Sequence, residues 1–418
     1  MNGASQANTE KRRLALCLDG TWNTMESQTN VSRMFKAIAD ALSGCAEQQK
    51  FYEEGVGTKL GEKVRGGAFG VGLDRNILRG YCWLVNNYQS GMPVPDENDP
   101  DREPFSRGDE IFIFGFSRGA FTARSLAGLI NRVGIIDRDK LPERSADPDR
   151  QLVQEAWELY RRKYPPGVEA RKTPECVDFR KANCHAAKIK FVGVWDTVGA
   201  LGIPATRAPI PLPAGDYRFH DTQLGRTIEN AFHAVAIDEH REDYNVTLWS
   251  ARHAIGTRRV EQRWFAGAHA NVGGGYDDDL LPDIPLLWMA QNAAECGLEF
   301  TADMNQAIEQ ARPCLAGAPA AFGLSGSEYM SSVRDSYGEF LWGTYKVFRA
   351  LTMRGPFYRR ILVPADGVAQ TIDPSAMMKW NADADYKPRN LVQAGRIDTE
   401  AAAPANVMAA AGAPGAEI

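Results

Sequence analysis

Apolar residues along the chain fall into two alternating patterns: short runs that suit buried strands, and longer stretches with helical spacing. Strand-like runs cover residues 14–18, 51–52, 111–114, 188–195, 246–249 and 261–266. Helical spacing covers residues 30–41, 73–88, 120–130, 147–160, 223–236 and 283–296. Because strands that alternate with helices are typical of a parallel sheet, the pattern predicts an α/β fold.

The most informative stretch is the apolar run 111–114, which continues through Gly115-Phe-Ser117-Arg-Gly119 directly into a helical pattern. A strand that turns into a helix through G-x-S-x-G is typical of the nucleophile elbow of α/β-hydrolases. Gly115 and Gly119 let the chain pass close to itself, so Ser117 is expected in a strained, exposed turn. The alternative is a structural turn without chemistry.

A serine nucleophile needs a histidine base and a carboxylate that orients this base. Of the six histidines, His269 alone directly follows a strand-like run and opens a glycine-rich loop, so it is the candidate base. Asp196 follows the run 188–195 and lies between Ser117 and His269, which is the α/β-hydrolase order. Asp238 is the competing acid, although its setting looks more helical.

Acyl transfer also needs hydrogen-bond donors for the oxyanion that develops in the transition state. The backbone N–H of Arg118, which follows the nucleophile, is one candidate. The second donor is expected in the loop after the first strand, from Gly20 or Thr21. The alternative for that loop is an Asp-Gly turn with no catalytic role.

Composition and charge exclude several other classes of function. The 418 residues are 44% hydrophobic and 24% charged, and the net charge of −5 gives no electrostatic indication of nucleic-acid binding. Seven scattered cysteines without C-x-x-C indicate neither a disulfide framework nor a zinc site. The loop 55–61 lacks the G-K-[ST] of a phosphate loop, and the acidic run 277–279 lacks EF-hand spacing. No cofactor and no metal are therefore expected.

The predicted catalytic domain, residues 14–300, is flanked and interrupted by segments of different composition. Residues 1–13 and 396–418 are expected to be disordered, 90–108 to be a polar insertion, and 301–395 to be a helical extension that packs on or caps the hydrolase. The first apolar run is too short for a signal peptide, and no run approaches the roughly 20 residues that span a bilayer. The chain is therefore expected to be cytoplasmic as made, without a transmembrane segment.

Residues 340–362 interleave aromatic side chains with five basic residues, among them Arg359 and Arg360. Such a stretch suits contact with anionic lipid head groups. The alternative is a partly buried helix with a solvated face.

Six motifs occur in a fixed order: CLDGTWN, YEEGVGT, GFSRGAFTAR, FVGVWDTVGALG, AVAIDEHR and WFAGAHANVGGGYDD. Over residues 14–294 the chain resembles an α/β-hydrolase family, long labelled a domain of unknown function, that includes phospholipase effectors of bacterial type VI secretion. The resemblance implies an α/β-hydrolase fold with helices on both faces of the sheet, and hydrolysis of phospholipid acyl esters. It also carries the nucleophile onto Ser117, the acid onto Asp196 and the base onto His269.

The sequence thus favours a serine ester hydrolase, most readily a phospholipase, whose substrate is a lipid or a membrane surface. The resemblance adds a component of a secretion apparatus or an immunity protein as possible partners, and delivery into another cell by a signal-independent secretion system. Two alternatives stay open: a carboxylesterase of non-lipid esters, and a non-catalytic binding or assembly protein on a hydrolase scaffold.

Overall fold

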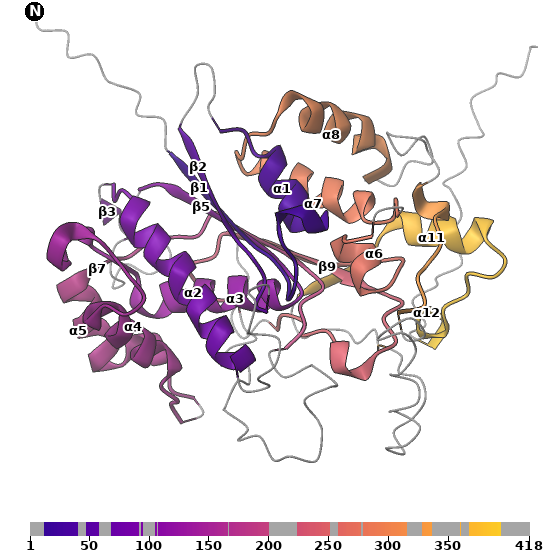
Figure 1. Cartoon of the computed structure of the whole chain (residues 1–418). Helices are drawn as coiled ribbons and strands as arrows, with labels where there is room; N and C mark the ends of the chain where they lie inside the picture. Colours follow the sequence, from indigo (N-terminus) through magenta and orange to yellow (C-terminus); the bar gives the residue numbers. More distant parts are fainter. Residues whose placement is uncertain are drawn as a thin grey trace, which may run out of the picture.

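A computed structural model describes residues 12–40, 47–57, 68–91, 93–94, 105–106, 108–165, 167–199, 224–250, 258–276, 279–315, 328–336, 360 and 368–393. In this part of the chain, seven strands form one sheet in the order β11-β10-β9-β8-β5-β1-β2, and every neighbouring pair is parallel (Figure 1). The strands are β1 (Arg13–Leu18), β2 (Gln48–Glu53), β5 (Glu110–Phe116), β8 (Phe191–Trp195), β9 (Asn230–Ala236), β10 (Arg259–Phe265) and β11 (Ala369–Ile372). The predicted α/β fold is confirmed.

Both faces of the sheet are buried, and neighbouring residues of a strand point to opposite faces. In β1, Leu14, Leu16 and Leu18 belong to the hydrophobic core on one face, whereas Ala15 and Cys17 belong to the core on the other. The two groups of helices lie on opposite sides of the sheet (Figure 1). The first core includes residues of α2 (Ala68–Asn87), α3 (Arg118–Val133), α4 (Gln151–Arg161) and α5 (Pro174–Asn183). The second includes residues of α1 (Asn30–Ala37), α7 (Asp283–Glu295) and α8 (Ala302–Leu315).

The C-terminal part of the described chain contributes an edge strand to the sheet. β11 runs parallel to β10, and Trp264, Tyr386 and Leu391 share a small core there with α11 (Pro374–Ala382) and α12 (Arg389–Gln393). The division into a catalytic domain 14–300 and an extension 301–395 stays a prediction. Two short antiparallel ribbons lie outside the sheet, β3 (Pro93–Val94) with β4 (Phe105–Ser106), and β6 (Ile135–Ile136) with β7 (Cys184–His185).

Two predicted elements are wrong. Residues 223–236 were expected to be helical, but Asn230–Ala236 is the strand β9, which lies between β8 and β10. Its last six residues are buried on both faces, so the alternation that marks a half-exposed strand is missing, and its alanines suit a helix. Residues 246–249 form no strand in the described chain, where Val246 makes a single bridge to Val198.

Among the helix boundaries that differ from the prediction are the end of α1 and the start of α4. The first helix, α1, ends at Ala37 instead of continuing to residue 41. α4 begins at Gln151 and not at residue 147, where the predicted helical stretch starts. The carboxylate of Asp147 accepts a hydrogen bond from the N–H of Asp149 (2.9 Å) and so stabilises a turn before the helix.

Several predicted features lie outside the described residues. They are residues 1–11, most of the insertion 90–108, residues 277–278 of the acidic run, the aromatic and basic stretch 340–362 apart from Arg360, and the tail 396–418.

Candidate active site

The turn after β5 holds Ser117 in a backbone conformation that few side chains adopt, with φ 58° and ψ −120°. The flanking glycines make this turn possible. A Cβ on Gly115 would lie 2.5 Å from the carbonyl oxygen of Gly119. A Cβ on Gly119 would overlap the carbonyl oxygen of Leu18. The strained turn has the geometry expected of an elbow, but Ser117 is only 4% exposed, so the expectation of an exposed serine is wrong.

Asp196 occupies a second strained turn, at the carboxyl end of β8, with φ 41°. Its N–H donates to the carbonyl oxygen of Ala234 (2.7 Å), and its Oδ1 accepts from the N–H of Ala236 (2.9 Å). The next N–H, that of Thr197, donates to Nε2 of His233 (3.1 Å). Because all three partners belong to β9, this neighbouring strand fixes the direction in which the carboxylate points.

His269 is the first residue of α6 (His269–Gly273) and follows β10 after a short turn. Its backbone N–H donates to Oε2 of Glu239 (3.2 Å). Its ring packs against two aromatic rings, with centroid distances of 4.6 Å to Phe116 and 5.1 Å to Tyr244. Backbone and ring are therefore both held in place.

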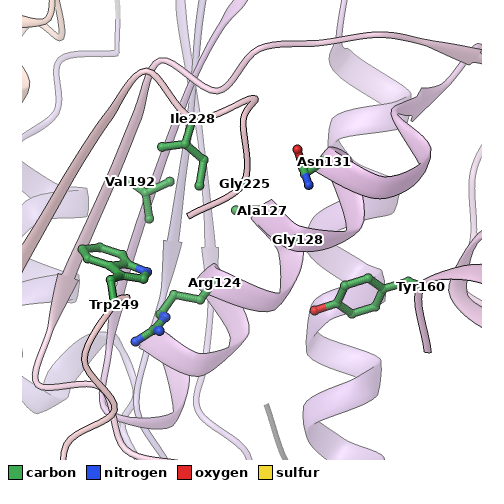
Figure 2. Close-up of a pocket in the computed structure, with 9 residues that line it drawn as sticks. All are labelled: Arg124, Ala127, Gly128, Asn131, Tyr160, Val192, Gly225, Ile228 and Trp249. Atoms are coloured by element: carbon green, nitrogen blue, oxygen red, sulfur yellow. The ribbon is translucent and has the colours of Figure 1, made fainter. Parts of the chain in front are cut away.

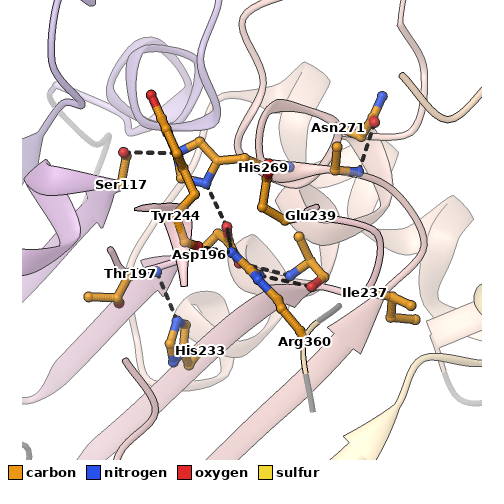
Figure 3. A network of polar contacts seen from close by, with 12 residues as sticks. Ser117, Asp196, Thr197, His233, Ile237, Glu239, Tyr244, His269, Asn271 and Arg360 are labelled. Carbon is orange, nitrogen blue, oxygen red and sulfur yellow. Dashed lines mark hydrogen bonds and ion pairs between the residues drawn. The ribbon is translucent and has the colours of Figure 1, made fainter. Parts of the chain in front are cut away.

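Ser117, His269 and Asp196 lie in one continuous series of polar contacts (Figure 3). Nε2 of His269 is 2.8 Å from Oγ of Ser117, and Nδ1 is 2.5 Å from Oδ2 of Asp196. The three residues are 4%, 6% and 0% exposed. With its proton on Nδ1, the imidazole donates to the carboxylate and leaves Nε2 free to accept the proton of the serine hydroxyl.

Asp238, the competing acid, lies two residues after the end of β9, so the expectation of a helical setting is wrong. Its Oδ2 accepts from the N–H of Gly267 (2.8 Å) and from the phenol of Tyr386 (2.9 Å). Burial raises the pKa of Asp238 to about 6, although both donors oppose this. Asp238 makes no hydrogen bond to His269 in the described chain.

The structure separates the two oxyanion candidates of the first loop. The N–H of Gly20 donates to Oδ1 of Asp19 (2.7 Å), whereas that of Thr21 has no acceptor among the described residues. A Cβ on Gly20 would lie 3.2 Å from Cβ of Ser117, so the loop contacts the elbow. Arg118, the candidate that follows Ser117, begins α3, where N–H groups point out of the helix toward its start.

The first loop is anchored by Asp19, a buried residue that the sequence did not single out. Its Oδ2 accepts hydrogen bonds from the hydroxyls of Thr29 (2.6 Å) and Tyr52 (2.7 Å). Thr29 caps α1 and Tyr52 belongs to β2, so two elements hold the loop against Ser117.

Burial keeps the imidazole of His269 neutral, and neighbouring donors and positive charge keep the carboxylate of Asp196 ionised. Burial lowers the pKa of His269, as does the charge of Arg241, while the hydrogen bond and charge of Asp196 act in the opposite direction. Burial alone would raise the pKa of Asp196, but the charge of Arg360 and the bond from His269 hold it well below its ordinary value. Burial also lowers the pKa of His233 to about 3, so this ring stays neutral.

Two charged groups beside the site were not predicted from the sequence. Glu239 pairs with Arg241 (2.8 Å) and lies in the motif AVAIDEHR, which could have drawn attention to it. Arg360 is 1% exposed and bonds both carboxylate oxygens of Asp196. The prediction of lipid contact is therefore wrong for Arg360. Nothing in the sequence distinguishes this arginine from the other basic residues of 340–362.

Residues 12–292 match the family described as "T6SS, Phospholipase effector Tle1-like, catalytic domain". The protein belongs to this family. The resemblance seen in the six sequence motifs is thereby confirmed. Ser117, Asp196 and His269 all lie inside the residues that match the Tle1-like catalytic domain, whereas Arg360 lies beyond them.

Individual relatives of this Tle1-like chain are distant. An uncharacterized protein of Saccharomyces cerevisiae is 26% identical over 265 residues, which are 58% of this chain and 33% of that protein. An uncharacterized protein from Pseudomonas aeruginosa with a crystal structure shows 19% identity and a TM-score of 0.42, covering 72% of this chain and 49% of its own. The Tle1 effector bound to the VgrG spike from the type VI secretion system shows 15% identity and a TM-score of 0.32, covering 64% and 51%. The chain thus spans about a third to a half of the length of these relatives.

A small cavity lies beside α3, and Figure 2 shows the side chains that line it. Its volume of ≈ 20 Å³ suits one or two water molecules, and its lining includes Arg124, Tyr160 and Trp249 but none of Ser117, Asp196 and His269.

Within the described ranges, no group of three His, Cys, Asp or Glu residues could hold a metal ion. None of the helices described is long and apolar enough to cross a membrane.

Proposed function

We propose that this protein is a serine hydrolase that cleaves acyl ester bonds of phospholipids. Ser117 is the nucleophile, His269 the base, and Asp196 the acidic residue whose carboxylate orients this base. The observation that carries the proposal is the series of contacts of 2.8 Å and 2.5 Å that joins these three side chains at a strained strand-to-helix turn. Membership of the Tle1-like phospholipase effector family supports phospholipid as the substrate class.

In the acylation step, Oγ of Ser117 attacks the carbonyl carbon of the ester while its proton moves to Nε2 of His269. The carbonyl oxygen becomes an oxyanion, which the backbone N–H groups of Arg118 and Thr21 stabilise. The tetrahedral intermediate then breaks its bond to the alcohol oxygen, which takes the proton from Nε2. A lysophospholipid leaves and an acyl-enzyme remains.

In the deacylation step, a water molecule gives a proton to Nε2 of His269 and its oxygen attacks the acyl carbon. The second intermediate releases the fatty acid, and Oγ of Ser117 recovers its proton. In both steps Asp196 accepts the hydrogen bond from Nδ1–H and stabilises the imidazolium that forms. The lowered pKa of His269 supports this role, because the resting base must be neutral.

The test compares purified wild-type protein with Ser117→Ala on phospholipid vesicles, with released fatty acid as the readout. We expect Ser117→Ala to lower the rate by about 10³-fold or more. Ser125→Ala is a matched control that should retain activity, since Ser125 is as buried as Ser117 and lies in α3, the helix that begins after Ser117. A folded Ser117→Ala protein with wild-type activity would sink the mechanism.

Two further arms separate the alternatives. A fluorophosphonate probe followed by peptide mass spectrometry should label Ser117 in the wild type and in Ser125→Ala. No labelling at Ser117 would favour a non-catalytic binding protein. Activity on p-nitrophenyl acyl esters without activity on phospholipid would instead favour a carboxylesterase of non-lipid esters.

Family membership alone also supports a cellular setting. We propose that the protein is delivered by a type VI secretion system, that a component of this apparatus or an immunity protein is its partner, and that its substrate lies at a membrane surface. Release of the protein from producing cells should then depend on a functional secretion apparatus. Equal release with and without that apparatus would contradict this proposal and leave the chemistry untouched.

A further inference from the structure

We infer that Arg360 is a positioning residue of this hydrolase, which aims the carboxylate of Asp196 at His269 and offsets its negative charge. The inference rests on the proposed function. It concerns a residue beyond the segment that matches the catalytic-domain family, residues 12–292.

Arg360 binds Asp196 through both carboxylate oxygens (Figure 3). Nη1 donates to Oδ1 (2.5 Å) and Nη2 donates to Oδ2 (2.9 Å), which is the paired geometry that makes arginine–carboxylate contacts directional. Oδ2 is also the oxygen 2.5 Å from Nδ1 of His269, and Oδ1 also accepts from the N–H of Ala236. The carboxylate cannot rotate without breaking several of these contacts at once.

The guanidinium of Arg360 is itself held from the other side. Nη1 donates to the carbonyl oxygen of Ala236 (2.8 Å) and Nη2 to that of Tyr244 (2.6 Å). These acceptors belong to the end of β9 and to the short helix η7 (Glu242–Tyr244). Since Arg360 is 1% exposed, solvent does not share these bonds, and the position of the charge is well defined.

The groups that face Asp196 leave Arg360 as its counter-ion in the described chain. His233, on β9, stays neutral because burial lowers its pKa to about 3. His269 is neutral in the resting enzyme, since burial lowers its pKa too. Among the described residues, the guanidinium that bonds the carboxylate, that of Arg360, is therefore the cation that compensates it.

The groups that face His269 come from three other places. Ser117 lies at Nε2, Tyr244 packs against the ring from η7, and Glu239 accepts from the backbone N–H. The carboxylate of Glu239 is compensated by Arg241, which bonds both of its oxygens at 2.8 Å. The net charge around His269 therefore changes mainly when Asp196 or Arg360 is replaced.

Loss of the Arg360 charge has a defined consequence. The uncompensated carboxylate of Asp196 would stabilise the imidazolium form of His269, because an opposite charge beside a base favours its protonated form. The ring would then hold a proton at higher pH and could not accept that of Ser117. Arg360 thus sets the pH below which the base is lost, in addition to aiming the acid.

The test that needs no activity is an NMR titration of ¹⁵N-labelled histidine in the Ser117→Ala background, with the His269 signal assigned by its loss in His269→Gln. Arg360→Met should raise the pKa of His269 by about one unit or more, whereas Arg360→Lys, which keeps the charge, should shift it by much less. Arg144→Met is the control, because it removes an exposed arginine bonded to Asp139 and should change nothing. An unchanged His269 pKa in folded Arg360→Met would overturn the inference.

The second test follows kcat and KM against pH on an ester that does not titrate. Arg360→Met should move the acid limb of kcat/KM to higher pH and lower kcat at least about tenfold on the plateau, with a smaller change in KM. Arg360→Lys should keep the acid limb and lose part of kcat, because an ammonium cannot bond both oxygens in the same fork. A merely structural residue would lower activity by the same factor at every pH.

The outcomes separate this inference from the proposed function. Ser117→Ala with wild-type activity contradicts the function itself. An inactive Ser117→Ala together with an Arg360→Met enzyme of wild-type pH profile contradicts the role of Arg360 alone. If Arg360→Met fails to fold, Arg360→Lys decides, and wild-type kcat in that variant overturns the inference.

Discussion

Asp196 and Asp238 follow neighbouring strands of one parallel sheet, yet among the described residues it is Asp196 that bonds His269, through Oδ2 at 2.5 Å. Asp238 instead bonds the N–H of Gly267 and the phenol of Tyr386. Two carboxylates at the same edge of a sheet can therefore have different roles, and the partner of each oxygen distinguishes them.

Replacing each of the two acids with Asn tests this assignment. Asp196→Asn should lower kcat by about 10⁴-fold, because an amide favours the wrong tautomer of His269 and cannot stabilise the imidazolium. Asp238→Asn keeps an acceptor for Gly267 and Tyr386 and should stay within a few-fold of the wild type. Kinetics of both variants on the same ester decide, and a larger loss in Asp238→Asn would reverse the assignment.

Gly20→Ala should lower kcat about tenfold or more while KM changes little, because the added Cβ pushes the Thr21 loop away from the developing oxyanion. This Cβ would lie 2.9 Å from Nδ2 of Asn23 and 3.2 Å from Cβ of Ser117. Gly80→Ala is the control: it adds a Cβ 3.3 Å from Leu126, in the core between α2 and α3. Equal kcat in Gly20→Ala and wild type would exclude this loop from oxyanion stabilisation.

The acid limb of kcat/KM should lie below pH 6.5. Only the neutral imidazole of His269 can accept the serine proton, so activity falls as the pH drops through its pKa in the folded enzyme. Burial lowers this pKa from the ordinary 6.5, which moves the limb to lower pH. A pH profile with a limb at pH 7 or above would contradict the charge balance described for the site.

Removing residues 301–418 should abolish activity although the truncated chain keeps Ser117, Asp196 and His269. It loses β11, which pairs with β10, and Arg360, which compensates the buried Asp196. Leaving such a buried charge unpaired costs on the order of 3–5 kcal/mol. The control is removal of residues 396–418, predicted to be disordered, which should preserve activity and solubility. An active, soluble chain of residues 1–300 would show that the extension is dispensable.

The positions of Ser117, Asp196 and His269 could be anticipated because each directly follows a strand-like run. Strands of a parallel sheet end at one edge, so residues that follow them gather there. β9 could not be anticipated in this way, because its burial on both faces removes the alternation that identifies a strand. Its misassignment also hid the fact that Asp238 lies at the same edge as Asp196.

Arg360 could not be predicted because its partner is 164 residues earlier in the chain. Its sequence neighbourhood is basic and aromatic, which favoured a surface role for every residue in it. A buried arginine is specified by acceptors, here Asp196 and two backbone carbonyls, that only the folded chain assembles. Glu239 is an intermediate case, since its motif was visible and its contact with His269 was not.

The stability of the wild type relative to Asp238→Asn should be lower above pH 6 than below pH 4, because Asp238 ionises in this range. Its pKa is about 6 in the folded chain against 3.8 when exposed, so the folded state binds more protons between these values. The contribution to stability is therefore fully present below pH 4 and is lost as the pH rises through 6. A shift of this size corresponds to about 3 kcal/mol. Denaturant unfolding of both proteins at pH 4 and pH 7 measures the difference between their free energies of unfolding. This difference should shift in favour of Asp238→Asn at pH 7. A difference that does not depend on pH would mean that Asp238 is ionised both at pH 4 and at pH 7. Its hydrogen bonds from Gly267 and Tyr386 would then stabilise the carboxylate more than burial destabilises it.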